Sequence, residues 1–161
     1  RQSELSINVN CTIRKEHDMT VKQISVFVEN KIGGLATITD LLAQAGVNIR
    51  ALSIAETSDF GILRLMVDDV FKAGNALKDN GFIYSVTDVL AVAGEDKPGS
   101  IAKIVSVLSN EGIGMDYAYA FFAKKSELAY MIVKVEEMDK AKKAFKANGI
   151  HLADENEIAK L

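Results

Sequence analysis

Two loops of this chain carry residue types that could hold a carboxylate. The first, "NKIGGL" at 30–35, places two glycines before a predicted helix. The second, "DKPGSI" at 96–101, places Pro98, Gly99 and Ser100 in the same context. Glycine allows close approach to the backbone, and the first N–H groups of a helix have no partner within the helix. Such loops are suited to bind an anionic group.

Two asparagines add hydrogen-bonding groups to the first loop. Asn30 lies in the loop itself, and Asn48 lies at the start of the strand expected after the helix. Each side-chain amide offers both donors and acceptors. A zwitterionic amino acid needs both kinds, because its carboxylate accepts hydrogen bonds and its ammonium donates them. On spacing alone the plainer interpretation is better supported: the glycines only shape a turn and the asparagines cap it.

Histidine and cysteine do not form a metal or nucleophile motif in this sequence. His17 and His151 lie near neither each other nor Cys11 at a metal-ligand spacing. We expect His151 to be a residue of a β-sheet. The phosphate-loop and dinucleotide-binding glycine motifs do not occur in the sequence. We therefore predict no catalytic residues, no metal and no cofactor.

Two pairs of adjacent carboxylates could suggest acid–base chemistry. They are Asp68-Asp69 and Glu136-Glu137, and each pair precedes a predicted helix. Acidic side chains at that position satisfy free backbone N–H groups and interact favourably with the helix dipole. We favour this structural interpretation over a catalytic one.

The loops belong to a pattern that occurs twice along the chain. Gly33 and Gly46 return as Gly99 and Gly112, each 66 residues later. Asn-Gly pairs at 80–81 and 148–149 are 68 residues apart, so the second unit has gained two residues between these positions. Insertions belong in exposed turns, which places the extra residues in the middle turn of the unit. The repetition predicts a duplicated domain.

Periodicity predicts the elements of each unit. Apolar residues that alternate with polar ones indicate strands, and apolar residues three or four apart indicate helices with one buried face. Gly46 is expected to end the first helix in a left-handed conformation. The first unit then has strands over 24–28, 48–55, 61–67 and 82–86 and helices over 35–45 and 70–78; the second has strands over 90–93, 115–123 and 128–135 and helices over 101–108 and 138–145.

This β-α-β-β-α-β order predicts the fold class. Each unit should form an antiparallel four-stranded sheet with two helices on one face, so that the chain is an α+β protein of two tandem ferredoxin-like modules. We set the modules at 22–87 and 88–161. Each is small and leaves one sheet face uncovered, so we expect the sheets to pack against each other or against a second copy of the chain.

Composition limits the function classes. The chain has 161 residues, of which 48% are hydrophobic and 25% charged, and its formal net charge is −3. Because no basic patch occurs, we expect neither nucleic acid nor membrane as a partner. The apolar runs are far shorter than the ~20 residues that span a bilayer. A single cysteine and the lack of a secretory signal favour the cytoplasm.

Residues 1–18 have no counterpart in either unit. The alternation of Leu5, Ile7 and Val9 suits an edge strand. The segment could equally be a leader or foreign sequence ahead of a true start at Met19. We assign it no function.

The repeated loops also resemble those of a known family. The stretches "VENKIGGLATITDLLAQAGVNI" (28–49) and "GEDKPGSIAKIVSVLSNEGIGM" (94–115) are similar to the loop, helix and turn of ACT domains, small regulatory modules of amino-acid metabolism. The resemblance covers 22–161 and implies the fold described above. It also implies that amino acids bind at interfaces between paired modules, through the first loop and the start of the second strand.

Carried over to this sequence, the resemblance implies a set of ligand-binding residues. Ile32 replaces the usual proline of the family, and the second unit has Asp96 and Gly114 where the first has Asn30 and Asn48. The first unit therefore looks better equipped for polar recognition. The implied residues are Asn30, Lys31, Ile32, Gly33, Gly34, Leu35, Asn48 and Ile49 in the first unit and Asp96, Pro98, Gly99, Ser100, Ile101 and Met115 in the second.

The resemblance implies a non-catalytic, amino-acid-binding regulatory protein that forms a homodimer. A free amino acid would be its ligand. The alternative is a regulatory subunit of a separate biosynthetic enzyme, similar to the small subunit of acetolactate synthase. A small enzyme on a ferredoxin-like sheet is a third class, and the sequence lacks residues for its chemistry.

Overall fold

The computed structural model describes residues 19–56, 59–123 and 128–161, so the predictions for residues 1–18 lie outside the described residues. The β-α-β-β-α-β order occurs twice, as predicted. The first unit consists of β1 (Val21–Glu29), α2 (Gly34–Gln44), β2 (Ile49–Glu56), β3 (Phe60–Val67), α3 (Val70–Asp79) and β4 (Tyr84–Glu95). The chain continues with α4 (Ser100–Asn110), β5 (Met115–Phe122), β6 (Leu128–Val135), α5 (Met138–Ala147), β7 (Leu152–Ala153) and α6 (Glu155–Lys160).

One long strand joins the two units, where the sequence predicted two. The predicted strands at 82–86 and 90–93 are both part of the 12-residue β4. Its residues 84–89 pair with β1, and its residues 90–95 pair with β6. The residues between the two predicted strands are Thr87, Asp88 and Val89, and they include no glycine or proline that would turn the chain. The strand therefore runs straight through and belongs to both units.

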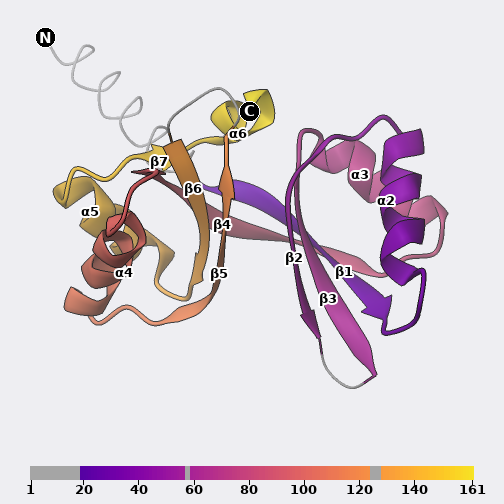
Figure 1. Ribbon diagram of the computed structural model, residues 1–161, viewed down its shortest axis with the longest axis horizontal. Helices are drawn as coiled ribbons and strands as arrows, with labels where there is room; N and C mark the ends of the chain where they lie inside the picture. The colour runs from indigo at the N-terminus through magenta and orange to yellow at the C-terminus, as the bar shows by residue number, and fades with distance from the viewer. Residues whose placement is uncertain (1–18, 57–58, 124–127) are drawn as a thin grey trace, which may run out of the picture.

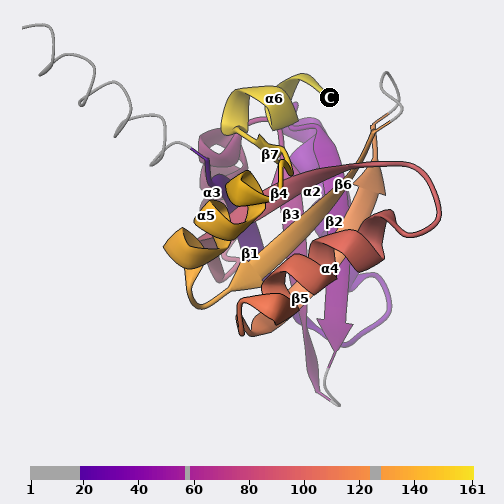
Figure 2. The ribbon, with the colours of Figure 1, turned by 90° about the vertical axis from the view of Figure 1, so that its left-hand side faces the viewer.

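The strands of both units form one continuous sheet. The strand order is β2-β3-β1-β4-β6-β5, with β7 also paired to β4, and the strand pairs are antiparallel. Helices α2 and α3 lie at one side of the molecule and α4 and α5 at the other (Figure 1). Turned by 90°, the view shows α4 and α5 in front of the strands of their own unit (Figure 2).

Each unit has its own core between its helices and one sheet face. The predicted face of α2 is buried through Ile38 and Leu42, and that of α4 through Ile104 and Leu108. Burial of such side chains contributes about 1.5–3 kcal/mol each. Further fully or nearly fully buried residues of the two cores are Ile24, Val26, Leu63, Leu65 and Leu77 in the first unit and Leu90, Val92, Val133 and Phe145 in the second.

A third apolar cluster lies where the sheet faces without helices meet. Ala51 and Met66 of the first unit are buried together with Tyr130 and Ile132 of the second. The short helix α6 closes this cluster through Ile158, which is 2% exposed. The expectation that bare sheet faces cover each other thus holds within one chain.

A buried polar network ties the two units together inside that interface. The side chain of Gln23 on β1 is fully buried. Its amide nitrogen donates to the hydroxyl of Tyr117 at 2.7 Å, and its amide oxygen accepts from the hydroxyl of Tyr119 at 2.7 Å. The Arg64 guanidinium lies 3.8 Å from the centre of the Tyr117 ring. Burial raises the pKa of Tyr119, so this hydroxyl stays protonated and can donate.

The paired carboxylates before the second helix of each unit make different hydrogen bonds. Asp69 caps α3, because its side chain accepts a hydrogen bond of 2.9 Å from the backbone N–H of Lys72. Asp68 accepts from the backbone N–H of Asn48. Glu137 occupies the N-cap of α5 without a side-chain cap bond. The predicted capping role is therefore confirmed for Asp69, whereas Asp68 bonds the backbone before β2 and Glu137 makes no cap hydrogen bond.

This difference predicts unequal effects of two matched substitutions. Asp69→Ala should lower the free energy of unfolding by about 1 kcal/mol, because it removes a cap hydrogen bond. Glu137→Ala should cost less than half of that. Urea denaturation of both variants measures the difference. Equal losses would show that the cap bond of Asp69 contributes nothing.

Candidate functional site

The loop between β1 and α2 contains two glycines, and a different structural constraint favours glycine at each position. Gly33 is the N-cap of α2 and has a φ of 88°, a left-handed conformation that other residues rarely adopt. A Cβ on Gly34 would lie 3.1 Å from Val28 Cγ1 and 3.2 Å from the carbonyl oxygen of Glu29. The turn alone therefore requires these glycines. Since the N-cap offers no side-chain hydrogen bond to α2, the first turn of the helix is also uncapped.

The second loop repeats this arrangement. Gly99 is the N-cap of α4 with a φ of 92°, again without a side-chain cap. The backbone N–H of Lys97 donates to the carbonyl of Glu95 at 2.9 Å, as that of Lys31 does to Glu29 at 2.8 Å. Two loops with different side chains thus share one backbone geometry.

A Glu–Lys ion pair flanks each loop. Lys31 pairs with Glu29, and Lys97 pairs with Glu95. The hydrogen bond from each lysine lowers the pKa of its glutamate, so both carboxyls stay ionised well below neutral pH. All four side chains are exposed, so the pairs contribute little to stability. They do place one negative and one positive group beside each loop.

The structure places Asn30 and Asn48 at opposite ends of the first unit. Glu29, just before Asn30, pairs with Phe60 at one end of β3, whereas Ile49, just after Asn48, pairs with Val67 at the other end. These pairs are separated by roughly 20 Å of strand. One unit therefore does not bring the two asparagines to one ligand.

The same separation holds in the second unit. Glu95, at the start of its loop, pairs with Leu128, whereas Met115 pairs with Val135 at the far end of β6. The predicted residues thus form two groups in each unit. The loop groups are 30–35 and 96–101, and the groups at the far ends are Asn48 with Ile49 and Met115 alone.

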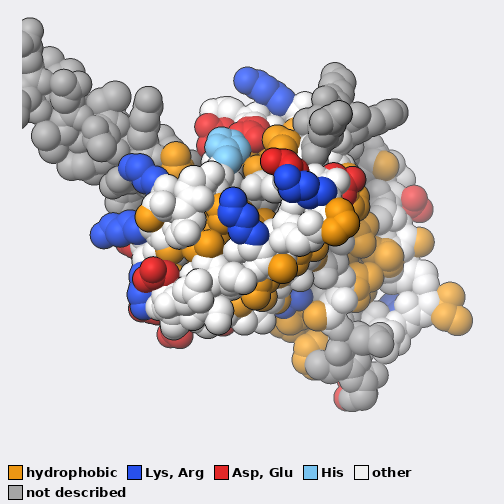
Figure 3. Space-filling view, turned by 60° about the vertical axis from the view of Figure 1, so that its left-hand side comes forward, with side chains coloured by type: hydrophobic (Ala, Val, Ile, Leu, Met, Phe, Trp, Pro, Cys, Tyr) orange, Lys and Arg blue, Asp and Glu red, His pale blue; other side chains and the backbone are white. Residues whose placement is uncertain are grey.

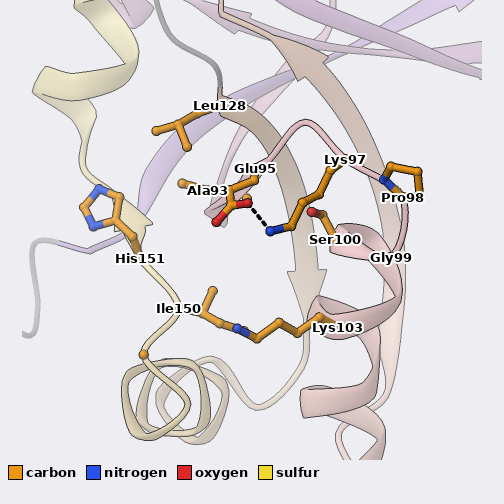
Figure 4. Close-up of a pocket in the computed structure, with 12 residues that line it drawn as sticks. Ala93, Glu95, Lys97, Pro98, Gly99, Ser100, Lys103, Leu128, Ile150 and His151 are labelled. Carbon is orange, nitrogen blue, oxygen red and sulfur yellow. Dashed lines mark ion pairs between the residues drawn. The ribbon is translucent and has the colours of Figure 1, made fainter.

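The second loop borders a hollow of about 550 Å³. It lies between the loop, α4 and the segment that precedes β7 (Figure 4). Of the predicted residues, Pro98, Gly99 and Ser100 line it, whereas Asp96 and Ile101 do not. The volume falls within the range of about 300–1,000 Å³ that is typical of small-molecule sites.

Sequence reasoning missed the other wall of this hollow. It is formed by Gly149, Ile150 and His151, some fifty residues away from the loop in sequence, while Lys103 on α4 lines the space as well. The link is a backbone hydrogen bond of 2.9 Å from the N–H of Ala93 to the carbonyl of His151. His151 lies just before β7 and its side chain is exposed, so it is not the sheet residue that we predicted.

Surface charge on this side of the molecule is mixed. Lysine, aspartate and glutamate side chains alternate with hydrophobic ones on the face seen in Figure 3. Over the described residues, no group of three His, Cys, Asp or Glu side chains is arranged to hold a metal ion. In the same part of the chain, no helix has the length and apolar character needed to cross a membrane.

Comparisons with known proteins identify a family for this chain and solved structures that are similar to it. A family model for the ACT domain pair matches residues 19–161. Protein BT0572 from Bacteroides thetaiotaomicron, a solved structure, is 40% identical with a TM-score of 0.82, over 89% of this chain and 98% of that chain. A search of curated proteins gave no match.

Two more distant solved structures share the fold. The ligand-free regulatory subunit of aspartate kinase from Thermus thermophilus is 16% identical with a TM-score of 0.57, over 78% of this chain and 91% of that chain. A structure of aspartokinase alpha and beta subunits is 20% identical with a TM-score of 0.54, over 82% of this chain and 95% of that chain. At these identities the likeness concerns the fold alone.

Proposed function

This chain belongs to the ACT domain pair family, and from that premise we propose that it is a non-catalytic regulatory protein that binds a free amino acid. The observation that carries the proposal is the hollow beside the second loop. Pro98, Gly99 and Ser100 line it, and α4 begins there without a side-chain cap. An uncapped helix start beside a small concave space suits the carboxylate of an amino acid.

Binding of one ligand by both Asn30 and Asn48 requires a second module. Asn30 and Asn48 lie too far apart to hold one ligand within a unit, so one of them has to come from a neighbouring module. We propose a homodimer that supplies it. In support, β2 is an edge strand of the sheet whose Leu52 and Ile54 are 46% and 49% exposed. Exposed apolar edge strands are prone to pair with another chain.

The two proposed modules are 22–87 and 88–161. Their boundary lies within β4, so they share a strand and are not joined by a flexible linker. Ligand binding in one module would then be transmitted to the other through β4 and through the Gln23 network. Such mechanical coupling suits a regulatory role.

A screen of the twenty L-amino acids by thermal unfolding tests the proposal. A ligand at 100 times its dissociation constant should stabilise the protein by about 2.7 kcal/mol. For a chain of this size, that raises the melting temperature by roughly 5–10 °C. The D-enantiomer of the responsive amino acid serves as the control and should give a smaller shift. If none of the twenty raises the melting temperature at millimolar concentration, the proposed function is wrong.

The alternative role, as regulatory subunit of a separate biosynthetic enzyme, is distinguished by a second experiment. A subunit would co-purify with a larger enzyme and change its kinetics, whereas a sensor would bind its amino acid alone. Affinity purification of the tagged chain from its native cells separates the two roles.

A further inference from the structure

Four ionisable side chains line the hollow of the second unit: Glu95, Lys97, Lys103 and His151. Glu95 and Lys97 pair with each other. The ammonium of Lys103 has no hydrogen bond or ion pair within the part of the chain that the structure describes, and its charge acts on the carboxylate of Glu95, whose pKa it helps to lower. Apart from His151, these side chains carry a net charge of about +1 at neutral pH. The hollow therefore has more positive than negative charge, because one carboxylate, that of Glu95, serves both lysines.

The side chains of the two lysines extend over the hollow. Figure 4 shows Lys97 and Lys103 extending from the loop and from α4 toward the side occupied by Ile150 and His151. The ring of His151 is held by Glu157, whose carboxylate accepts a hydrogen bond of 2.8 Å from Nε2. Basic groups thus come from the loop, the helix and the segment before β7.

Folding does not account for Lys103. It lies in the first turn of α4, and that turn has no acidic residue. A cation at this end of a helix interacts unfavourably with the helix dipole. Helix stability therefore does not explain a lysine here, and a ligand carboxylate in the hollow would give its exposed ammonium a direct partner.

The first unit lacks this basic character. Its position corresponding to Lys103 is Thr37, whose hydroxyl donates to the carbonyl of Gly33 at 3.0 Å. Its position corresponding to His151 is Ile83. The equivalence is fixed by matching backbone bonds, from Phe27 N–H to the Ile83 carbonyl and from Ala93 N–H to the His151 carbonyl, both 2.9 Å. Because these basic side chains occur only in the second unit, we expect the two units to bind different ligands.

We propose that the hollow of the second unit selects amino acids with a second carboxylate, the dicarboxylic class. The inference rests on the proposed function and adds the ligand class. One carboxylate of such a ligand lies at the uncapped start of α4 near Ser100, and the other interacts with Lys103. Glu95 accepts hydrogen bonds from the ligand ammonium. A dicarboxylic amino acid carries a net charge of −1 at neutral pH, which complements the hollow.

Calorimetry on the intact chain with paired probes tests this proposal. The probes are L-aspartate against L-asparagine and L-glutamate against L-glutamine, because each amide has the shape of its acid without the charge. At least one acid should bind about tenfold or more tightly than its amide. Lys103→Met should weaken binding of that acid about tenfold and leave the amide unchanged. Lys143→Met, an exposed lysine on α5 outside the hollow, should leave both unchanged.

The other outcomes overturn the inference in distinguishable ways. An acid and its amide that bind equally, or an acid whose affinity survives Lys103→Met, would show that the second carboxylate is not recognised there. Inorganic phosphate that displaces the acid at equal concentration would indicate a general anion site. If a neutral amino acid binds and the acids do not, this inference fails and the proposed function stands. If no amino acid binds, both fail.

Discussion

Replacing Gln23 with leucine is expected to lower the free energy of unfolding by about 2–5 kcal/mol. Leucine keeps most of the volume but cannot hydrogen-bond, so the hydroxyls of Tyr117 and Tyr119 lose their partner inside the interface. Each buried polar group left unpaired costs about 1–3 kcal/mol. Urea denaturation measures the loss as a lower midpoint with an unchanged slope.

A triple variant provides the control. In Gln23→Leu combined with Tyr117→Phe and Tyr119→Phe, both tyrosine hydroxyls are removed as well, and of the network only the part-buried hydroxyl of Ser25, which accepts from Gln23 at 3.2 Å, remains. Replacement of both partners by apolar groups is often nearly neutral, so the triple variant should recover most of the stability lost by Gln23→Leu alone. If the triple variant is as unstable as the single one, packing and not hydrogen bonding explains the loss. If Gln23→Leu costs less than about 1 kcal/mol, water satisfies the hydroxyls.

The repeated fold is predictable from sequence because each of its signals is local. The alternation of a strand, the apolar face of a helix and an Asn-Gly turn can each be recognised within a stretch of about ten residues. The burial of Gln23 could not be predicted in this way. It is a polar residue in a strand, and nothing near it indicates that it is fully buried. Its partners lie 94 and 96 residues away on β5, so only the packing of the two units reveals its role.

The continuous strand β4 illustrates a second limit. The repeat suggested two independent modules and hence two strands. Duplication repeats the elements, but it does not determine how the end of one unit connects to the start of the next. The apolar and β-branched residues near Val86 and Val89 favour an extended chain, and no glycine or proline separates them. The absence of turn signals was the available evidence for one strand.

Only part of the candidate site could likewise be predicted from sequence. The loop residues from Pro98 to Ser100 were identified from local sequence, and they do line the hollow. His151 was missed as a site residue, because its contribution depends on how the last strand pairs with β4. Lys103 was missed although it lies one helical turn after Gly99, and that spacing was a local signal for it. The separation of Asn30 from Asn48, however, follows from topology alone. A helix that connects two parallel strands places the loop after the first and the turn before the second at opposite ends.

That separation leads to the last prediction. Asn30→Ala and Asn48→Ala should each weaken binding of the responsive amino acid at the first loop about ten- to a hundredfold, because each removes a hydrogen bond to a charged group. Neither should change stability measurably. Both side chains are exposed, and neither side-chain amide makes a hydrogen bond within the described residues. Calorimetry gives the affinities and urea denaturation the stabilities, and Asn75→Ala, an exposed asparagine on α3, is the control.

Mixing the two variants tests whether the site is shared between copies. In a symmetric dimer, Asn30 of one copy and Asn48 of the other would contact one ligand. A heterodimer of the two variants then has one site with both asparagines and one site with neither. After subunit exchange at equal amounts, about a quarter of the first-loop sites should bind as tightly as in the parent protein. A mixture that titrates as the plain sum of the two variants would place Asn30 and Asn48 in separate sites. A single-chain mass in sedimentation equilibrium, with and without ligand, would exclude the shared site altogether.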